Sequence, residues 1–234
     1  MLQKPEIIKD NQLEQKPEII KDNQLEVFER VYHDEGWSSN QRESVSGTGS
    51  ILKHTEELRS SLPEICKKYN INNILDVACG DFNWMKEIVH KFKFYRGADI
   101  VNDLIDSNKE NYDKLENVEF ITADIIEQFD LCIKGKSFDA IILKDVLVHF
   151  PDEYVNKVLS SVKTSGIKYV FITHFTDLNK NYDIPEFNGW RPQNFNLDPW
   201  NMGEPLEIIP SLKEEYSFDE KTMIDKTLSL WQIK

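Results

Sequence analysis

The chain has 234 residues, a formal net charge of −13 at pH 7 and an isoelectric point near 4.9. A chain of this length buries about 70% of the surface that it exposes when unfolded, which is enough for one substantial hydrophobic core. The acidic balance and the lack of a compact basic stripe argue against nucleic acid as a partner, because binding to a phosphate backbone depends on clustered lysine and arginine.

No run of residues approaches the length of an apolar membrane span, and the amino terminus lacks the apolar core of a signal peptide. The three cysteines, Cys66, Cys79 and Cys132, are far apart and odd in number. They favour neither a disulfide framework nor a zinc site, and no metal ligand is assigned. We therefore expect a protein of the reducing cytoplasm that is not exported and does not associate with a membrane.

Residues 3–14 recur without change as residues 15–26. Two copies are too few for a solenoid, which needs several stacked units. We interpret residues 1–26 as a duplicated N-terminal arm of which one copy is sufficient. Each copy carries an Ile-Ile pair and a leucine among charges, so the arm could dock as a short helix or join two subunits of a homodimer. The alternative is a partly ordered surface segment.

The region 27–70 is predicted to be helical and to act as a lid. Apolar residues at helical spacing predict one helix over residues 27–35 and a second over residues 51–69, interrupted near Pro63. The intervening residues are small, polar and turn-prone, which suits a loop that closes over a ligand. Within it, Trp37 is a candidate substrate contact, and Thr48 or Ser50 could cap the second helix.

The stretch 73–85, NILDVACGDFNWM, predicts a buried parallel strand that turns sharply at Gly80 into a helix over residues 84–92. Ligands of open α/β sheets bind outside the carboxyl ends of the strands, where the strand order reverses. The turn has one glycine, so the G-x-G-x-x-G fingerprint of dinucleotide sites is missing. Asp81 at the helix start would repel a pyrophosphate. Together with Asp76 and Asp99, it places three carboxylates around one crevice, which suits a cationic ligand.

Later strands follow at regular intervals. Residues 94–100, 118–123, 138–143 and 168–174 predict four of them, and a helix is expected over residues 102–115. The connections are long enough for parallel pairing, so the pattern predicts an α/β sandwich. Residues 206–209 and 227–233 are candidates for the two last strands. In a Rossmann-like sheet an acid at the position of Asp99 accepts hydrogen bonds from ribose hydroxyls, although it could instead cap a loop.

Three motifs resemble those of class I S-adenosylmethionine-dependent methyltransferases. DVACG at 76–80 matches their first motif with Ala78 in a glycine position, FITADI at 120–125 resembles the adenine-binding segment, and KDVLVHFP at 144–151 resembles the segment where cofactor and acceptor meet. The G-W-S loop, D-V-A-C-G-D-F-N-W and G-W-R-P at 189–192 look like a bacterial subgroup. The resemblance implies a three-layer Rossmann-like sandwich with a mostly parallel seven-stranded sheet, an antiparallel C-terminal hairpin, and a catalytic domain over residues 71–234.

The same resemblance implies S-adenosyl-L-methionine as the cofactor, which leaves as S-adenosyl-L-homocysteine. Asp99 would bind the ribose, Asp124 the adenine amino group, and the isoleucines after these two acids the adenine ring. The residues expected to bind the cofactor are Asp76, Ala78, Cys79, Gly80, Asp81, Trp84, Asp99, Ile100, Asp124, Ile125 and Lys144.

His149, His174 and Asp145 follow the fourth and fifth strands and are the catalytic candidates. A histidine can accept a proton near neutral pH, and a general base adds roughly 10² to 10⁴ in rate when the acceptor is a hydroxyl. The alternative for each histidine is a structural role, such as a bond between His149 and the backbone. Asp145 could instead hold the methionine amino group or a loop.

Residues 177–209 form a long segment rich in Asn, Pro and aromatic residues, which we predict to be an acceptor-binding tail. Arg191 could bind a carboxylate or phosphate of the acceptor bidentately, or it could stack on Trp190. Trp190 and Trp200 could form an apolar wall around a sugar, and the alternative is that they pack over the sheet.

The sequence thus predicts an enzyme that transfers a methyl group to a small molecule or to a glycan or polysaccharide precursor, with oxygen as the favoured atom. Two alternatives stay open. One is a nicotinamide-dependent oxidoreductase on the same kind of sheet, against which the single glycine and Asp81 count. The other is a non-catalytic module that binds S-adenosylmethionine or its demethylated product.

Overall fold

The computed structural model describes residues 23–34, 43–187, 189–211, 216–218, 221–223 and 225–233. Trp37 and most of the duplicated arm lie outside these residues, so the expectations for both stay predictions. In the described part of the chain no helix is long and apolar enough to cross a membrane.

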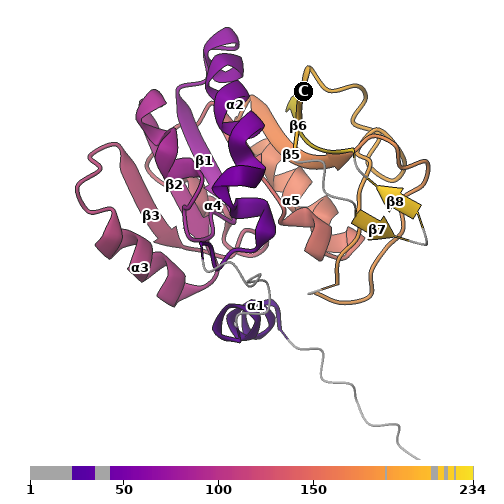
Figure 1. Ribbon diagram of the computed structural model, residues 1–234, viewed down its shortest axis with the longest axis horizontal. Coiled ribbons are helices and arrows are strands. Elements are labelled where there is room, and N and C mark those ends of the chain that lie inside the picture. Colours follow the sequence, from indigo (N-terminus) through magenta and orange to yellow (C-terminus); the bar gives the residue numbers. More distant parts are fainter. Residues whose placement is uncertain are drawn as a thin grey trace, which may run out of the picture.

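A seven-stranded sheet forms the centre of the molecule (Figure 1). Its spatial order is β3, β2, β1, β4, β5, β9, β6. The first five pair in parallel, and β9 runs antiparallel to both of its neighbours. The strands are β1 (Asn73–Val77), β2 (Phe94–Asp99), β3 (Val118–Thr122), β4 (Ala140–Leu143), β5 (Tyr169–Phe175), β6 (Glu207–Pro210) and β9 (Lys226–Gln232). The predicted Rossmann-like α/β fold with a mostly parallel sheet and an antiparallel C-terminal pair is confirmed.

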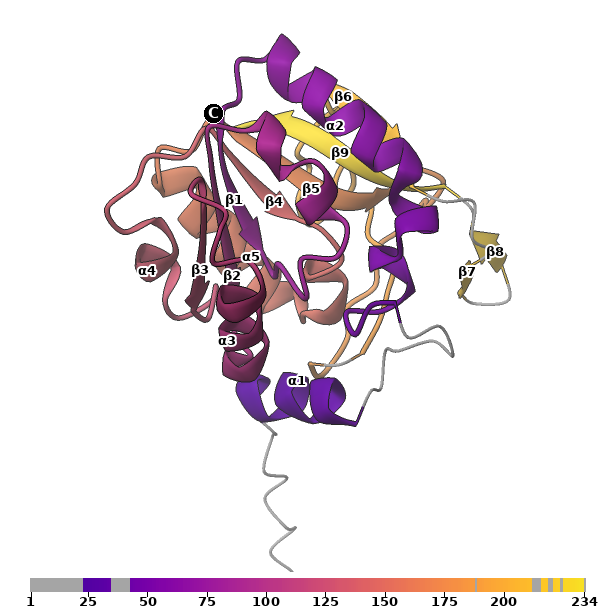
Figure 2. The same ribbon diagram turned by 60° about the vertical axis from the view of Figure 1, so that its left-hand side comes forward.

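Helices cover both faces of this sheet, which makes a three-layer sandwich (Figures 1 and 2). The helices are α1 (Gln24–His33), α2 (Glu56–Lys68), α3 (Asn102–Asn111), α4 (Phe129–Ile133) and α5 (Asp152–Thr164). Neighbouring residues of a strand enter different cores: Leu75 packs with α4 and α5, whereas Ile74 packs with α2 and α3. This follows from the alternation of side chains along a strand.

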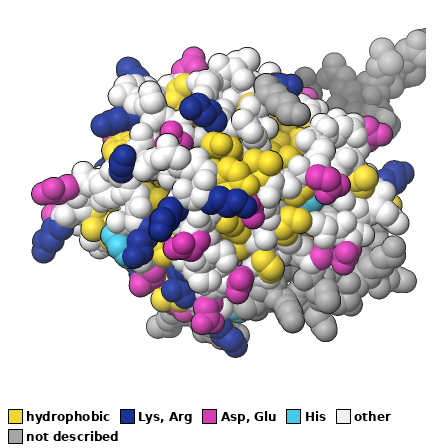
Figure 3. Space-filling view, turned by 90° about the horizontal axis from the view of Figure 1, so that it is seen from above, with side chains coloured by type: hydrophobic (Ala, Val, Ile, Leu, Met, Phe, Trp, Pro, Cys, Tyr) yellow, Lys and Arg dark blue, Asp and Glu magenta, His cyan; other side chains and the backbone are white. Residues whose placement is uncertain are grey.

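The helix α1 lies across the carboxyl ends of the strands, at the lower edge of the sheet in Figure 1. The opposite face of the molecule, seen from above in Figure 3, carries a patch of hydrophobic side chains with charged side chains of both signs around it. A short hairpin of β7 (Tyr216–Phe218) and β8 (Lys221–Met223) separates β6 from β9 along the chain. The sequence pattern did not indicate this hairpin.

Three local predictions were wrong. Residues 84–92 form two short 3-10 helices, Met85–Glu87 and Val89–Lys91, in place of one α-helix. The β-branched Ile88 and Val89 lie where the two 3-10 helices meet, and such residues have a lower helix propensity than unbranched ones. The two 3-10 helices still bury the apolar side chains of Met85, Ile88 and Val89.

The other two errors concern the second predicted helix. Residues Leu52–Thr55 are a 3-10 helix, α2 begins only after them, and no side chain caps either one, so neither Thr48 nor Ser50 has the predicted capping role. α2 also continues through Pro63. Burial of Leu58 and Leu62 against the sheet offsets the backbone hydrogen bond that a proline removes.

The duplication allows a direct test of the arm. Asn23, which caps α1 by accepting a hydrogen bond from Glu26, and Gln24 both belong to the second copy. Deletion of residues 3–14 leaves that copy in place. We expect an unchanged midpoint of thermal unfolding, whereas deletion of residues 3–26 should lower it by removing the cap and the first turn of α1. Equal midpoints for the two deletions would contradict this.

Candidate functional site

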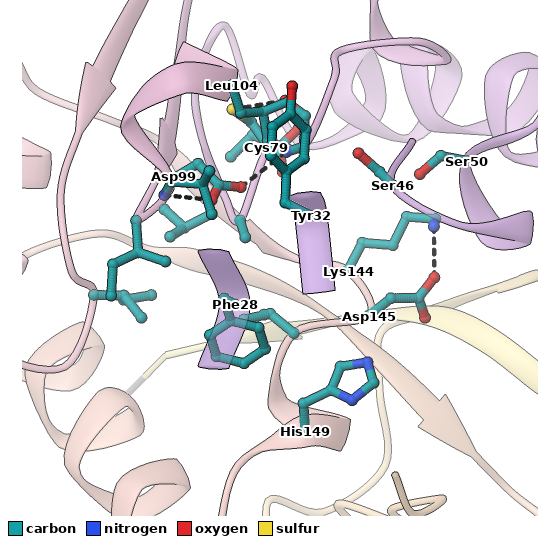
Figure 4. Close-up of a pocket in the computed structure, with 18 of the residues that line it drawn as sticks. Phe28, Tyr32, Ser46, Ser50, Cys79, Asp99, Leu104, Lys144, Asp145 and His149 are labelled. Atoms are coloured by element: carbon teal, nitrogen blue, oxygen red, sulfur yellow. Dashed lines mark hydrogen bonds and ion pairs between the residues drawn. The ribbon is translucent and has the colours of Figure 1, made fainter. Parts of the chain in front are cut away.

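A cavity opens at the carboxyl ends of β1, β2 and β4, at the point where the strand order reverses (Figure 4). Its empty space is about 970 Å³ including the open mouth. This is the location at which open α/β sheets bind ligands. Eleven of the predicted site residues line it: Asp76, Ala78, Cys79, Gly80, Trp84, Asp99, Ile100, Ile125, Lys144, Asp145 and His149.

The turn after β1 forms one wall, and Gly80 is essential to its shape. Gly80 has φ +58°, and a Cβ atom there would lie only 2.3 Å from the Oγ atom of Ser46. The backbone N–H of Asp81 donates to that Oγ atom at 2.8 Å, and the Asp81 carboxylate accepts from the N–H of Val45 at 2.9 Å. Residues 43–50, called here the closing segment, are therefore fixed against this turn.

Asp99 lies at the tip of β2 and is buried. One carboxylate oxygen accepts from the N–H of Gly80 and the other from the N–H of Val101, both at 3.1 Å. Burial raises the pKa of Asp99, and the two backbone donors oppose this rise. Each oxygen keeps a further lone pair, so the side chain can still accept hydrogen bonds from a ligand.

Asp76, the strand residue before the turn, is also buried. Its carboxylate accepts from the Tyr95 hydroxyl at 2.8 Å. Burial raises the pKa of Asp76 to about 7, although the Tyr95 bond and the charge of Lys144 act in the other direction. A cationic ligand would favour the ionised form of this carboxyl group.

The raised pKa of Asp76 predicts a pH-dependent stability. The folded protein binds a proton at this site up to about pH 7, whereas the unfolded chain loses it near pH 4. Between these values stability falls as the pH rises, by up to about 1.4 kcal/mol per pH unit. Asp76→Asn should remove this contribution, so that in urea unfolding from pH 4 to pH 8 its stability falls less with rising pH than that of the wild type. The exposed Asp113→Asn is the control, and an unchanged slope in Asp76→Asn would contradict the assignment.

Asp145 follows β4 and has a left-handed backbone, with φ +58°. Its carboxylate accepts from the ammonium groups of Lys144 at 2.7 Å and of Lys226 at 2.9 Å, and from the hydroxyl of Thr173 at 3.0 Å. Burial alone would raise the pKa of Asp145, but the two lysines outweigh it and hold the pKa well below its usual range. A carboxylate this acidic is a poor proton acceptor, so its contacts favour a binding role over that of a base.

His149 lines the cavity from a 3-10 helix, Leu147–His149, that follows β4. Its Nδ1 atom lies 2.8 Å from the carbonyl oxygen of Gly189, which fixes the tautomer with the proton on Nδ1 and leaves Nε2 as the acceptor nitrogen. Burial lowers the pKa of His149. The imidazole is therefore neutral at pH 7, the state that a general base needs.

Side chains of α1 form part of the cavity wall, which the sequence pattern did not indicate. Gln24, Phe28 and Tyr32 line it from α1, and Figure 4 shows the two aromatic rings in the cavity wall. The Phe28 ring packs edge-on against His149, with 6.5 Å between ring centroids. The helical spacing predicted an apolar face on this helix, but only the tertiary structure shows what that face covers.

The structure does not bring six other predicted residues to the cavity. Asp81 instead binds the closing segment. Asp124 lies in a neighbouring groove, within 3.1 Å of the Gln24 amide. Trp190 packs on Phe175, and Trp200 on Phe195.

The remaining two, His174 and Arg191, are fully buried. His174 accepts from the N–H of Phe195, and burial lowers its pKa to about 4. Arg191 donates to the carbonyl of Phe150 and to the carboxylate of Asp152. These contacts pack the tail, 177–209, against β5 and the start of α5, and neither residue lines the cavity.

Residues 74–165 match a methyltransferase domain. These residues contain β1 to β4, α3 to α5, and nearly all of the strand tips that form the cavity. A search of curated proteins by sequence gave no match.

Several solved structures share the fold. Magnesium protoporphyrin IX methyltransferase (ChlM) from Synechocystis PCC 6803, solved with bound SAH, has a TM-score of 0.58 and 12% identity over 88% of this chain and 96% of that one. An S-adenosylmethionine-dependent methyltransferase from Clostridium acetobutylicum ATCC 824 has a TM-score of 0.54 and 14% identity over 76% and 91%. An O-methyltransferase family protein from Burkholderia thailandensis has a TM-score of 0.52 and 15% identity, over 77% of this chain and 56% of that one. At these identities the likeness establishes a methyltransferase fold.

Among the described residues no three His, Cys, Asp or Glu side chains are grouped so that they could hold a metal ion.

Proposed function

We propose that this protein is an S-adenosylmethionine-dependent methyltransferase that acts on a small molecule or a glycan precursor at an oxygen atom. One observation carries the proposal: the residues that match a methyltransferase domain build a cavity in which Asp76 and Asp99 flank a one-glycine turn. Two buried carboxylates beside that turn suit a nucleoside with a positive sulfur better than a diphosphate.

The cavity residues fit the cofactor by their chemistry. Asp99 has lone pairs left for ribose hydroxyls, and Ile100, Leu104 and Ile125 offer apolar surface for an adenine ring. Gly80 has no Cβ, which lets Ser46 of the closing segment lie against the turn beside the cavity. On the other side, Lys144 and Asp145 supply one cation and one anion for the carboxylate and ammonium of an amino acid.

The bound cofactor would supply an electrophilic methyl group, so the protein mainly has to align the acceptor and exclude water. Positioning of this kind can contribute about 7 to 11 kcal/mol. The closing segment and α1 cover the cavity and would restrict water. His149, held by Gly189 and neutral at pH 7, would accept the proton of an acceptor hydroxyl, and such a base supports the proposal of oxygen as the methylated atom.

Calorimetry with S-adenosylmethionine, S-adenosylhomocysteine and NAD tests the proposal. We expect the first two to bind and NAD not to bind. Asp99→Ala should weaken binding of both by about 1 to 3 kcal/mol, through loss of charged hydrogen bonds, and the exposed Asp113→Ala serves as the control. Binding of NAD alone would overturn the proposal. If S-adenosylmethionine binds but is not converted to S-adenosylhomocysteine in the presence of any hydroxyl acceptor from a panel of sugars and sugar phosphates, a non-catalytic module is favoured.

A further inference from the structure

A continuous line of contacts crosses the site from the C-terminal strand to the closing segment. The Lys226 ammonium of β9 contacts the Asp145 carboxylate at 2.9 and 3.0 Å, and Lys144 contacts the same carboxylate at 2.7 Å. Lys144 also donates to the carbonyl oxygen of Gly49 at 2.9 Å. Residues 177 positions apart in the sequence, Gly49 and Lys226, are thus joined through two side chains.

The line is closely packed at both ends. The side chains of Lys144 and Lys226 are only 7% and 8% exposed. A Cβ atom on Gly49 would lie 2.6 Å from Asp145 Oδ2 and 3.4 Å from Lys226 Nζ. The closing segment can therefore reach this position only because residue 49 has no side chain.

Lys144 and Lys226 both contact the Asp145 carboxylate, and their burial explains why they need a negative partner. A buried ammonium group is stable only when it is paired, and burial lowers the pKa of Lys144 while Asp145 opposes this. With Lys226 present, the Asp145 carboxylate has two cationic partners on its two oxygens. If Lys226 were absent, the Asp145 carboxylate would lose a group that holds both of its oxygens. Lys144, still attracted to that carboxylate, would then follow its shift away from Gly49.

We propose that Lys226 is a positioning residue: it shares the Asp145 carboxylate with Lys144, so that Lys144 holds Gly49 and keeps the closing segment over the cavity. Ser46, three residues earlier in the closing segment, is bonded to the turn at Gly80. The bond at Gly49 is therefore a second attachment of the segment beside the cavity. The inference rests on the proposed function only for the identity of the ligand.

The experiment compares Lys226→Met with Lys226→Arg, and with Lys168→Met as an exposed control. Amide hydrogen exchange of residues 43–50 is measured without ligand, and calorimetry measures the affinities for S-adenosylmethionine and S-adenosylhomocysteine. In Lys226→Met we expect exchange of the closing segment to rise by about tenfold, and both affinities to fall by about tenfold together. Lys226→Arg, which keeps the charge and can contact both carboxylate oxygens, should stay near the wild type.

A pure charge effect would look different. Removal of one positive charge would tighten binding of the sulfonium compound relative to its neutral product, and that result would overturn the proposal, as would unchanged exchange or equal defects in the methionine and arginine variants. If Lys226→Met does not fold, Gly49→Ala interrupts the same line from its other end and should give the same paired losses. If the wild type binds neither compound, the proposed function fails, while hydrogen exchange still decides the role of Lys226.

Discussion

Replacement of His149 by alanine is expected to slow methyl transfer to a hydroxyl by about 10² to 10⁴ and to leave the affinity for S-adenosylmethionine unchanged. The reason is the geometry of the ring: Nδ1 is 2.8 Å from the Gly189 carbonyl oxygen, so Nε2 is the nitrogen that can accept a proton. Loss of the base lowers the rate of the chemical step, whereas the proposed cofactor contacts are made by other side chains of the cavity.

Two further variants sharpen this test. His149→Asn keeps a donor near the Nδ1 position without a basic nitrogen, so it should be as slow as the alanine variant. The exposed His90→Ala should match the wild type. Because burial lowers the pKa of His149, wild-type turnover should be flat through neutral pH and should fall only below the usual histidine pKa of about 6.5. Turnover of His149→Ala within threefold of the wild type would rule out the base role.

The site residues that can be predicted from the sequence are those whose place depends on local patterns along the chain. Asp76, Gly80 and Asp99 follow strands whose apolar runs are visible in the sequence, and a parallel sheet brings all its carboxyl ends to one edge. Their place in the cavity was therefore predictable. The contact of Lys226 with Asp145 could not be predicted in this way, because the two residues are 81 positions apart in the sequence. The same holds for Phe28 of α1.

His174 shows a second kind of limit. Successive side chains of a strand point to opposite faces, and in β5 it is Thr173 that contacts Asp145, while His174 faces Phe195 and Trp231. The sequence pattern located the end of β5 but could not tell which of these two neighbours contacts Asp145. Asp81 instead contacts Val45 and Ser46 of the closing segment, which lie 36 and 35 positions away in the sequence, and the strand pattern does not indicate such a contact.

Replacement of Arg191 by methionine is expected to lower the free energy of unfolding by about 3 to 5 kcal/mol, the usual cost of breaking a buried ion pair by removal of one partner. Arg191 has no exposed surface, and its guanidinium contacts both the Phe150 carbonyl and the Asp152 carboxylate. Arg191→Lys should recover only part of the loss, since one ammonium group cannot reproduce the planar fork of donors. Urea unfolding at pH 7 measures the effect.

A double-mutant cycle with Asp152→Asn separates the ion pair from the rest of the packing. The Asp152 side chain is 23% exposed, so its removal alone should cost less than removal of Arg191, and the two changes together should cost less than their sum. If Arg191 bound the acceptor instead, Arg191→Met would keep the stability of the wild type and weaken only acceptor binding. Because the guanidinium is enclosed by the chain's own carbonyl and carboxylate groups, we expect the opposite: a loss of stability, and a turnover in the folded fraction that stays close to the wild-type value.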